Sequence, residues 1–160
     1  MTALPSTWKT SGPMADATPL ATIGYEAATL ADVIGRLQGA GVELVIDVRA
    51  VAASRRPGFS KTILGASLAE AGIDYLHLRA LGTPKAGREA ARAGRTQEMR
   101  AIFEAHLEEP EAQAQLARAT QASARRRAAL LCYEAEAARC HRAILAKRIS
   151  EVTGAPVTDL

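Results

Sequence analysis

The segment "LLCYEAEAARCHR", Leu130 to Arg142, places two thiols close to an imidazole in the sequence. Its first cysteine, Cys132, follows an apolar run and can act as a nucleophile if the pKa of its thiol is lowered. The carboxylates of Glu134 and Glu136 argue against this role, because negative charge raises the pKa of a thiol and repels anionic substrates. The alternative is that Cys132 is a small apolar residue, buried where a strand ends.

Cysteine and histidine are ligands that zinc prefers, so a zinc site formed by Cys132, Cys140 and His141 is one alternative. However, Cys140 and His141 are neighbours in a helix that we expect to run from about Arg139 to Val152. Adjacent side chains on a helix point about 100° apart, so both reach one ion only if the first turn is distorted. We therefore predict no metal site, and nothing in the sequence identifies a cofactor.

A second group of charged residues follows the apolar run Leu44 to Val48, in "DVRAVAASRRPGFSK". Arginines such as Arg49 and Arg55 can bind a phosphate, a carboxylate or a nucleotide through paired hydrogen bonds. The alternative is that Arg49 pairs with Asp47 or Glu26 and only ties the loops together. The cations expected to contribute to anion binding are Arg49, Arg55, Arg56, Lys61 and Arg142.

Acidic residues accompany these cations. Glu26 and Asp47 are candidates for a general acid and base in the cleavage of a glycosidic or nucleoside bond. Glu134 is expected to pair with Arg142 and to brace the Cys132 loop, because a buried arginine needs a partner. The residues predicted to carry proton transfer or attack are Glu26, Asp47, Cys132 and Glu134. The residues predicted to bind the ligand are Tyr25, Arg49, Ser54, Arg55, Lys61, His141 and Arg142.

Apolar runs and helical patterns that alternate along the chain predict the elements that position these residues. Strands are expected at Leu20–Gly24, Leu44–Val48, Ile73–Leu78, Ala128–Cys132 and Pro156–Leu160. Helices are expected after Thr29 and Ser60, in two alanine-rich stretches separated near Pro110, and from about Arg139. This alternation predicts a three-layer, Rossmann-like α/β fold, with a mostly parallel sheet and helices on both faces. Ligands bind such sheets at the carboxyl ends of the strands, where the candidate residues are expected to meet.

The segments "TIGYE", "VIDVRAVAASRRPGFSK", "GIDYLHLRALGTPK" and "LLCYEAEAARCHR" resemble, in this order and over Thr22 to Leu160, the DUF488 family. The resemblance implies a three-layer α/β fold with a polar pocket, and it implies no reaction. Ala27-Ala28 departs from the family pattern, which often has glycine or a hydroxyl residue there.

The cysteine and the "DVR" strand are also similar to features of rhodanese-like sulfurtransferases and thiol phosphatases. In those phosphatases an arginine follows the nucleophile by six positions. Here Arg139 follows Cys132 by seven, with no glycine in between.

Composition limits the class of protein. The chain has 160 residues, of which 48% are hydrophobic, and no apolar run approaches the length that crosses a bilayer, so we expect no membrane partner. Residues 1–19 are expected to be a flexible tail and residues 20–160 a single domain. Without an apolar export signal in that tail we expect a cytoplasmic protein with free thiols. The sequence does not indicate an oligomeric state.

The basic run Arg125 to Arg127 raises the possibility of a nucleic-acid-binding module. The run lies at a predicted helix end, where cations also interact well with the helix dipole. A net charge of +3 and an aromatic content of 4% argue against nucleic acid.

From the charged residues expected to meet at the carboxyl ends of the strands, we predict an enzyme-like polar pocket for a small anionic or nucleotide-like ligand. Besides a nucleic-acid-binding module, the alternative to this function is a thiol-dependent transferase or hydrolase that uses Cys132.

Overall fold

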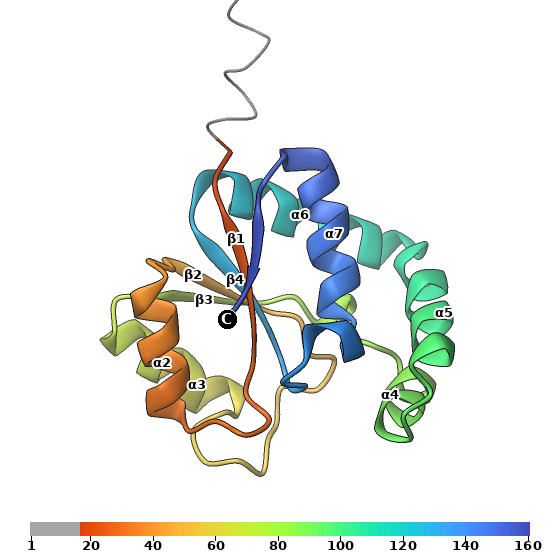
Figure 1. Ribbon diagram of the computed structural model, residues 1–160, viewed down its shortest axis with the longest axis horizontal. Helices are drawn as coiled ribbons and strands as arrows, with labels where there is room; N and C mark the ends of the chain where they lie inside the picture. Colours follow the sequence, from red (N-terminus) through yellow and green to blue (C-terminus); the bar gives the residue numbers. More distant parts are fainter. Residues whose placement is uncertain (1–16) are drawn as a thin grey trace, which may run out of the picture.

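The computed structural model describes residues 17–160, so most of the predicted tail lies outside the described residues. A five-stranded sheet forms the centre, with the strand order β3-β2-β4-β1-β5 and every neighbouring pair parallel (Figure 1). The strands are β1 (Leu20–Gly24), β2 (Leu44–Asp47), β3 (Asp74–His77), β4 (Ala128–Cys132) and β5 (Val157–Asp159). The predicted α/β fold is confirmed, and the sheet is entirely parallel rather than mostly so.

Helices cover both faces of the sheet (Figure 1). The helices are α2 (Leu30–Gly39), α3 (Lys61–Glu70), α4 (Lys85–Arg92), α5 (Thr96–Leu107), α6 (Pro110–Arg125) and α7 (Arg142–Thr153), with short 3-10 turns η1 (Arg79–Leu81) and η2 (Ala137–Arg139). On one face, α2 and α3 pack on alternate strand residues such as Ile23 and Leu131. On the other face, α5, α6 and α7 pack on the intervening residues, such as Ile46 and Leu130. Strands buried on both faces explain the continuous apolar runs in the sequence.

The start of α2 follows the predicted pattern. The Thr29 hydroxyl accepts a hydrogen bond from the Asp32 amide, and the Asp32 carboxylate accepts one from the Thr29 amide. This capping box satisfies two amides that the helix itself leaves unpaired. Ser60 takes the corresponding position before α3, but its hydroxyl bonds to the main chain of Ser54 instead and closes the loop after β2.

Two helix predictions are wrong in detail. The alanine-rich region forms three helices, because Gly94, with φ +79°, ends α4 and separates it from α5. The last helix begins at Arg142 rather than near Arg139, because η2 and an extended Cys140 precede it. The second difference changes the geometry of the candidate site.

Parallel pairing brings the carboxyl ends of β1, β2 and β4 together. Gly24 lies opposite Cys132, and Asp47 lies opposite Leu131. The loops that follow these strands therefore emerge side by side at one edge of the sheet, which we call the carboxyl edge. Within residues 17–160, no helix is both long enough and apolar enough to cross a membrane.

Candidate functional site

A pocket of about 580 Å³ opens at the carboxyl edge. Its walls come from the loops after β1, β2, β3 and β4, from α4 and α5, and from the segment before α7. The lining residues are Tyr25, Arg49, Ala50, Val51, Ala53, Ser54, Arg55, Thr83, Arg88, Ala91, Arg92, Met99, Cys132, Tyr133, Glu134, Arg139, Cys140 and His141. The volume suits a small metabolite, and the location is the one that open parallel sheets use for ligands.

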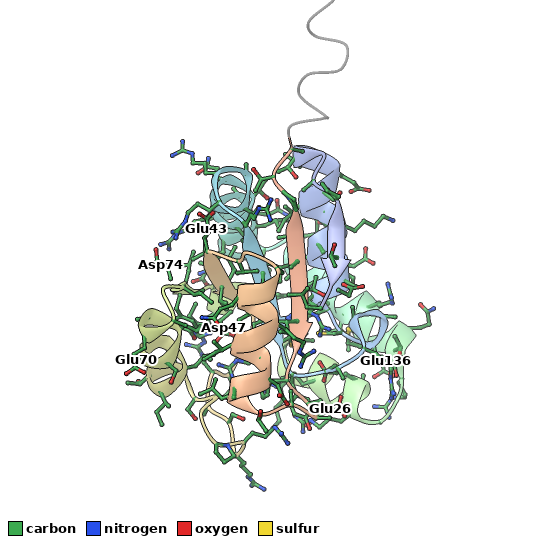
Figure 2. All side chains as sticks on the ribbon, turned by 60° about the vertical axis from the view of Figure 1, so that its left-hand side comes forward. Glu26, Glu43, Asp47, Glu70, Asp74 and Glu136 are labelled. Carbon is green, nitrogen blue, oxygen red and sulfur yellow. The ribbon has the colours of Figure 1, made fainter. Side chains whose placement is uncertain are left out.

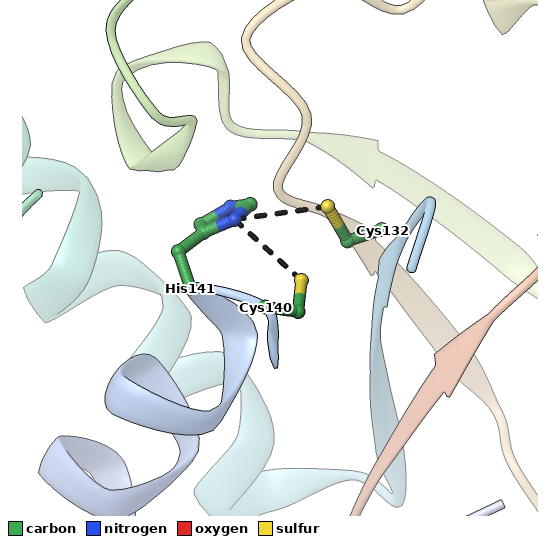
Figure 3. Close-up of side chains that lie close together, drawn as sticks. All are labelled: Cys132, Cys140 and His141. Atoms are coloured by element: carbon green, nitrogen blue, oxygen red, sulfur yellow. Dashed lines mark hydrogen bonds between the residues drawn. The ribbon is translucent and has the colours of Figure 1, made fainter. Parts of the chain in front are cut away.

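Two thiols and an imidazole converge in this pocket (Figure 3). The Nδ1 atom of His141 lies 3.7 Å from Sγ of Cys132 and 3.6 Å from Sγ of Cys140. All three side chains are buried, and their potential ligand atoms lie within 4.8 Å of one another. We call these residues the thiol–imidazole cluster.

The local backbone explains why neighbouring residues can converge in this way. Cys140 has extended backbone angles, and His141 is the residue that precedes the first turn of α7. The expected 100° separation of their side chains holds only within a regular helix, so it does not apply here. The sequence-based spacing argument against convergence is therefore wrong.

His141 is held from both sides. Its Nε2 lies 2.8 Å from the carbonyl oxygen of Val48, and since a carbonyl only accepts, Nε2 carries a proton and donates it. The ring of Phe103 packs edge-on against the imidazole, with the ring centroids 4.9 Å apart. The second nitrogen, Nδ1, is thereby fixed toward the two sulfurs.

The ionisation of the cluster follows from burial and proximity. The hydrogen bond with Cys140, together with burial, raises the pKa of Cys132 well above that of an ordinary thiol. Burial alone would raise the pKa of Cys140, but the hydrogen bond from Cys132 and the charge of His141 lower it well below its usual range. Burial would also lower the pKa of His141, but Cys140 raises it. Burial, followed by the effect of Cys140, raises the pKa of Glu134 to about 7.

Arg142 braces the loop that carries the cluster. Its side chain is fully buried, and its guanidinium donates to the main-chain carbonyls of Glu134 and Ala135. The predicted bracing role agrees with this geometry, but the partners are main-chain carbonyls rather than the Glu134 carboxylate. In the same loop, the Glu26 carboxylate accepts a hydrogen bond from the Ala135 amide.

A family model described as "Domain of unknown function DUF488" matches residues 29–149. The chain belongs to the DUF488 family. No curated protein and no solved structure matches the chain. The membership predicted from the four sequence segments is thus confirmed, and the chemistry of this DUF488 chain has to be argued from its own residues.

The DUF488 pocket contains most of the predicted site residues. Those that line it are Tyr25, Arg49, Ser54, Arg55, Cys132, Glu134 and His141. Those that do not line it are Glu26, Asp47, Lys61 and Arg142. Lys61 is exposed at the start of α3, and Arg56 donates to the carbonyl of Ala28 rather than to the pocket.

Asp47 and Arg49 form a buried ion pair in this DUF488 chain. The guanidinium donates to both carboxylate oxygens, at 2.9 Å from Nε and 2.7 Å from Nη2. Tyr75 donates to the same carboxylate, and the remaining arginine nitrogen donates to the Tyr25 hydroxyl and the Phe59 carbonyl. Asp47 is fully buried, and Figure 2 shows it near the middle of the molecule, with Glu26 lower in the view. The two acids therefore do not form an adjacent pair.

The pKa shifts of Arg49 and Tyr75 agree with a role of these residues in holding the loops together. Burial would lower the pKa of Arg49, but its bonds to Asp47 raise that pKa above the ordinary value. Burial, and then donation to Asp47, raise the pKa of Tyr75. Arg49 is thus neutralised by its partner, and we assign the pair to holding the loops rather than to supplying free positive charge.

Sequence reasoning missed three arginines of the DUF488 pocket. Arg88 and Arg92 lie one turn apart on α4, and Arg139 belongs to η2. A spacing of four residues places two side chains on one face of a helix. Because α4 directly follows the loop after β3, this spacing was a signal that pointed to the carboxyl edge.

Gly24 is required where the loops after β1 and β4 meet. A Cβ atom at this position would overlap the main-chain carbonyl of Glu134, which cannot move away without displacing the Cys132 loop. We expect Gly24→Ala to lower the free energy of unfolding by about 1–3 kcal/mol, measured by urea denaturation. The control is Gly35→Ala on α2, where a Cβ meets no atom within 4 Å. That replacement is expected to stabilise the protein by about 0.5–1 kcal/mol. Equal effects of the two replacements would contradict the overlap.

Proposed function

We propose that this DUF488 chain binds a small anionic, nucleotide-like ligand in the pocket at the carboxyl edge, as an enzyme would. The observation that carries the proposal is an excess of arginine over acid in the wall. Arg55, Arg88, Arg92 and Arg139 line the pocket, and Glu134 is the one carboxylate among the lining residues. Arg88 donates from one nitrogen to the main-chain carbonyl of Thr83. The guanidinium groups of these four arginines offer further donors for phosphate or carboxylate oxygens.

The charges of the other acids nearby do not cancel this excess. Asp47 is already paired with Arg49, as described above. Glu136 lies 3.8 Å from Arg139, but both side chains are largely exposed, so water weakens their interaction. The pocket wall therefore carries more positive than negative charge, which supports an anionic ligand.

An aromatic wall supports the nucleotide-like part of the proposal. The Tyr25 ring stacks on Phe59 with 4.3 Å between centroids, and Tyr133 meets Tyr25 edge-on. The Tyr133 side chain is 43% exposed and lines the pocket. An exposed ring beside arginines can stack on a planar organic group while the arginines hold its anionic part.

A thiol-dependent transferase or hydrolase is the second candidate function. The observation that favours it is the contact between Cys132 and His141 in the pocket wall. Because the pKa of the Cys132 thiol is raised, attack by this thiol requires the imidazole to take its proton as a general base. The test is a stoichiometric acyl or sulfur adduct on Cys132, detected by mass spectrometry after incubation with activated esters or thiosulfate. An adduct that persists in Cys132→Ser would reject this role.

Removal of a pocket arginine is expected to weaken anion binding. Loss of one charge-assisted hydrogen bond costs about 1.5–3 kcal/mol, so Arg55→Ala and Arg88→Ala should each weaken binding by roughly tenfold or more. The measurement is the thermal stabilisation of the protein by inorganic phosphate and by a set of nucleoside monophosphates. Lys61→Ala is the matched control, because Lys61 is exposed and does not line the pocket. Stabilisation that survives in both arginine variants, or that fails in the control, would reject the proposal.

A further inference from the structure

The thiol–imidazole cluster has the donor set of a metal site. Cys132, Cys140 and His141 supply two sulfurs and one nitrogen, a combination that zinc binds in sites with an open fourth position. Thiolate and imidazole select zinc and similar transition metals over magnesium or calcium, which prefer oxygen. The donors are provided by the end of β4 and by the residues before α7, which the fold holds together.

The sulfur–nitrogen distances in the cluster match tetrahedral coordination. With metal–sulfur and metal–nitrogen bonds of about 2.3 and 2.05 Å, tetrahedral angles place sulfur and nitrogen about 3.6 Å apart. The two sulfur–nitrogen distances are 3.7 and 3.6 Å. The two sulfurs lie within 4.8 Å of each other, compared with about 3.8 Å between two sulfurs at tetrahedral angles. The three donors are therefore close to the arrangement that surrounds one ion.

The surroundings of the cluster also suit a metal. A ligating histidine usually donates its other ring nitrogen to a carbonyl or carboxylate, and Nε2 of His141 donates to the Val48 carbonyl. The amide of Arg142, at the start of α7, donates to Sγ of Cys140. A helix N-terminus and an amide donor both stabilise a thiolate.

We propose that Cys132, Cys140 and His141 bind one divalent transition metal ion, with zinc the preferred ion, and leave a fourth coordination position open to the pocket. Binding replaces the thiol protons, which pass to solvent. All three ligands line the arginine-walled pocket, so an oxygen of an anionic ligand, or a water molecule, has access to the open position. This proposal goes beyond anion binding and does not depend on it.

The parent protein tests the proposal without any substitution. The reduced, chelator-stripped full-length chain is titrated with Co²⁺ in the absence of air, and its absorption spectrum is recorded. We expect saturation at one ion per chain, with intense visible bands of tetrahedral cobalt, thiolate-to-cobalt charge transfer in the near ultraviolet, and displacement by Zn²⁺. A spectrum without thiolate charge transfer, or the absence of uptake, would overturn the proposal.

Variants identify the ligands. Cys140→Ser and His141→Gln are expected to weaken Zn²⁺ binding by more than about a hundredfold in competition with a chromophoric chelator. His77→Gln is the matched control, because His77 also contacts a main-chain carbonyl through Nε2 but lies outside the cluster. Unchanged affinity in both ligand variants, with native circular dichroism, would overturn the assignment. If these variants do not fold, the cobalt spectrum of the parent protein decides.

Three further outcomes separate this proposal from its competitors. A Cys132–Cys140 disulfide in protein alkylated directly on cell lysis would overturn it, because an oxidised pair cannot ligate a metal ion. Loss of phosphate stabilisation with a retained cobalt spectrum would reject anion binding and support the metal site. The reverse result would reject the metal site and leave anion binding intact.

Discussion

Replacing Arg49 by alanine is expected to lower the free energy of unfolding by about 3–5 kcal/mol, measured by urea denaturation. The reason is that Asp47 is completely buried and would keep an uncompensated negative charge. The same replacement also removes donors from the Phe59 carbonyl and the Tyr25 hydroxyl.

An exposed ion pair provides the matched control for this prediction. Arg95 contacts Glu98 at 3.0 Å, but both side chains are about half exposed. Arg95→Ala is expected to cost less than about 1 kcal/mol. The double variant Asp47→Asn with Arg49→Met should recover part of the stability lost in Arg49→Ala, because it leaves no buried charge. A loss below 1 kcal/mol in Arg49→Ala would show that Asp47 finds another partner.

Replacing Phe103 by alanine is expected to cost about 3–5 kcal/mol, again measured by urea denaturation. Phe103 is fully buried in the core on the α5–α7 face, and its ring contacts His141 edge-on. The replacement leaves a cavity beside the imidazole, so it should also loosen the orientation of His141 toward the two thiols.

Two control replacements show which part of the loss in Phe103→Ala comes from the cavity. Phe103→Leu fills most of the cavity and is expected to cost less than about 1.5 kcal/mol. Val152→Ala, at a side chain that is 74% exposed, should change the stability by less than about 0.5 kcal/mol. If Phe103→Ala costs no more than Val152→Ala, the packing described for this face of the sheet is incorrect.

Arginines that look alike in the sequence have different surroundings in the structure. Arg49 and Arg142 are buried and hold loops, through a carboxylate in one case and main-chain carbonyls in the other. Arg55 and Arg92 are exposed and line the pocket. Burial, which the sequence does not record, separates the two groups.

The sequence by itself determined the layers of the molecule. Apolar runs such as "LVID" and "AALLC" are short and alternate with helical patterns, which together predict a parallel sheet covered on both faces. In the structure every residue of both runs is buried. A parallel sheet brings the loops after its strands to one edge, so the neighbourhood of Arg49, Cys132 and His141 also followed from the sequence. The Thr29 capping box was predictable because it depends on residues only three positions apart.

Only the tertiary structure decided where helices break near the site. A glycine at position 94 does not by itself exclude one continuous helix. The structure shows the break, because Gly94 has a positive φ that no α-helix contains. Arg142 is the first residue of α7. Its buried guanidinium donates to the carbonyls of Glu134 and Ala135, which lie in the loop before the helix. These contacts coincide with the extended backbone at Cys140, whose side chain meets those of His141 and Cys132. Local sequence patterns carry no record of such contacts, because they form between segments that meet only when the sheet is assembled.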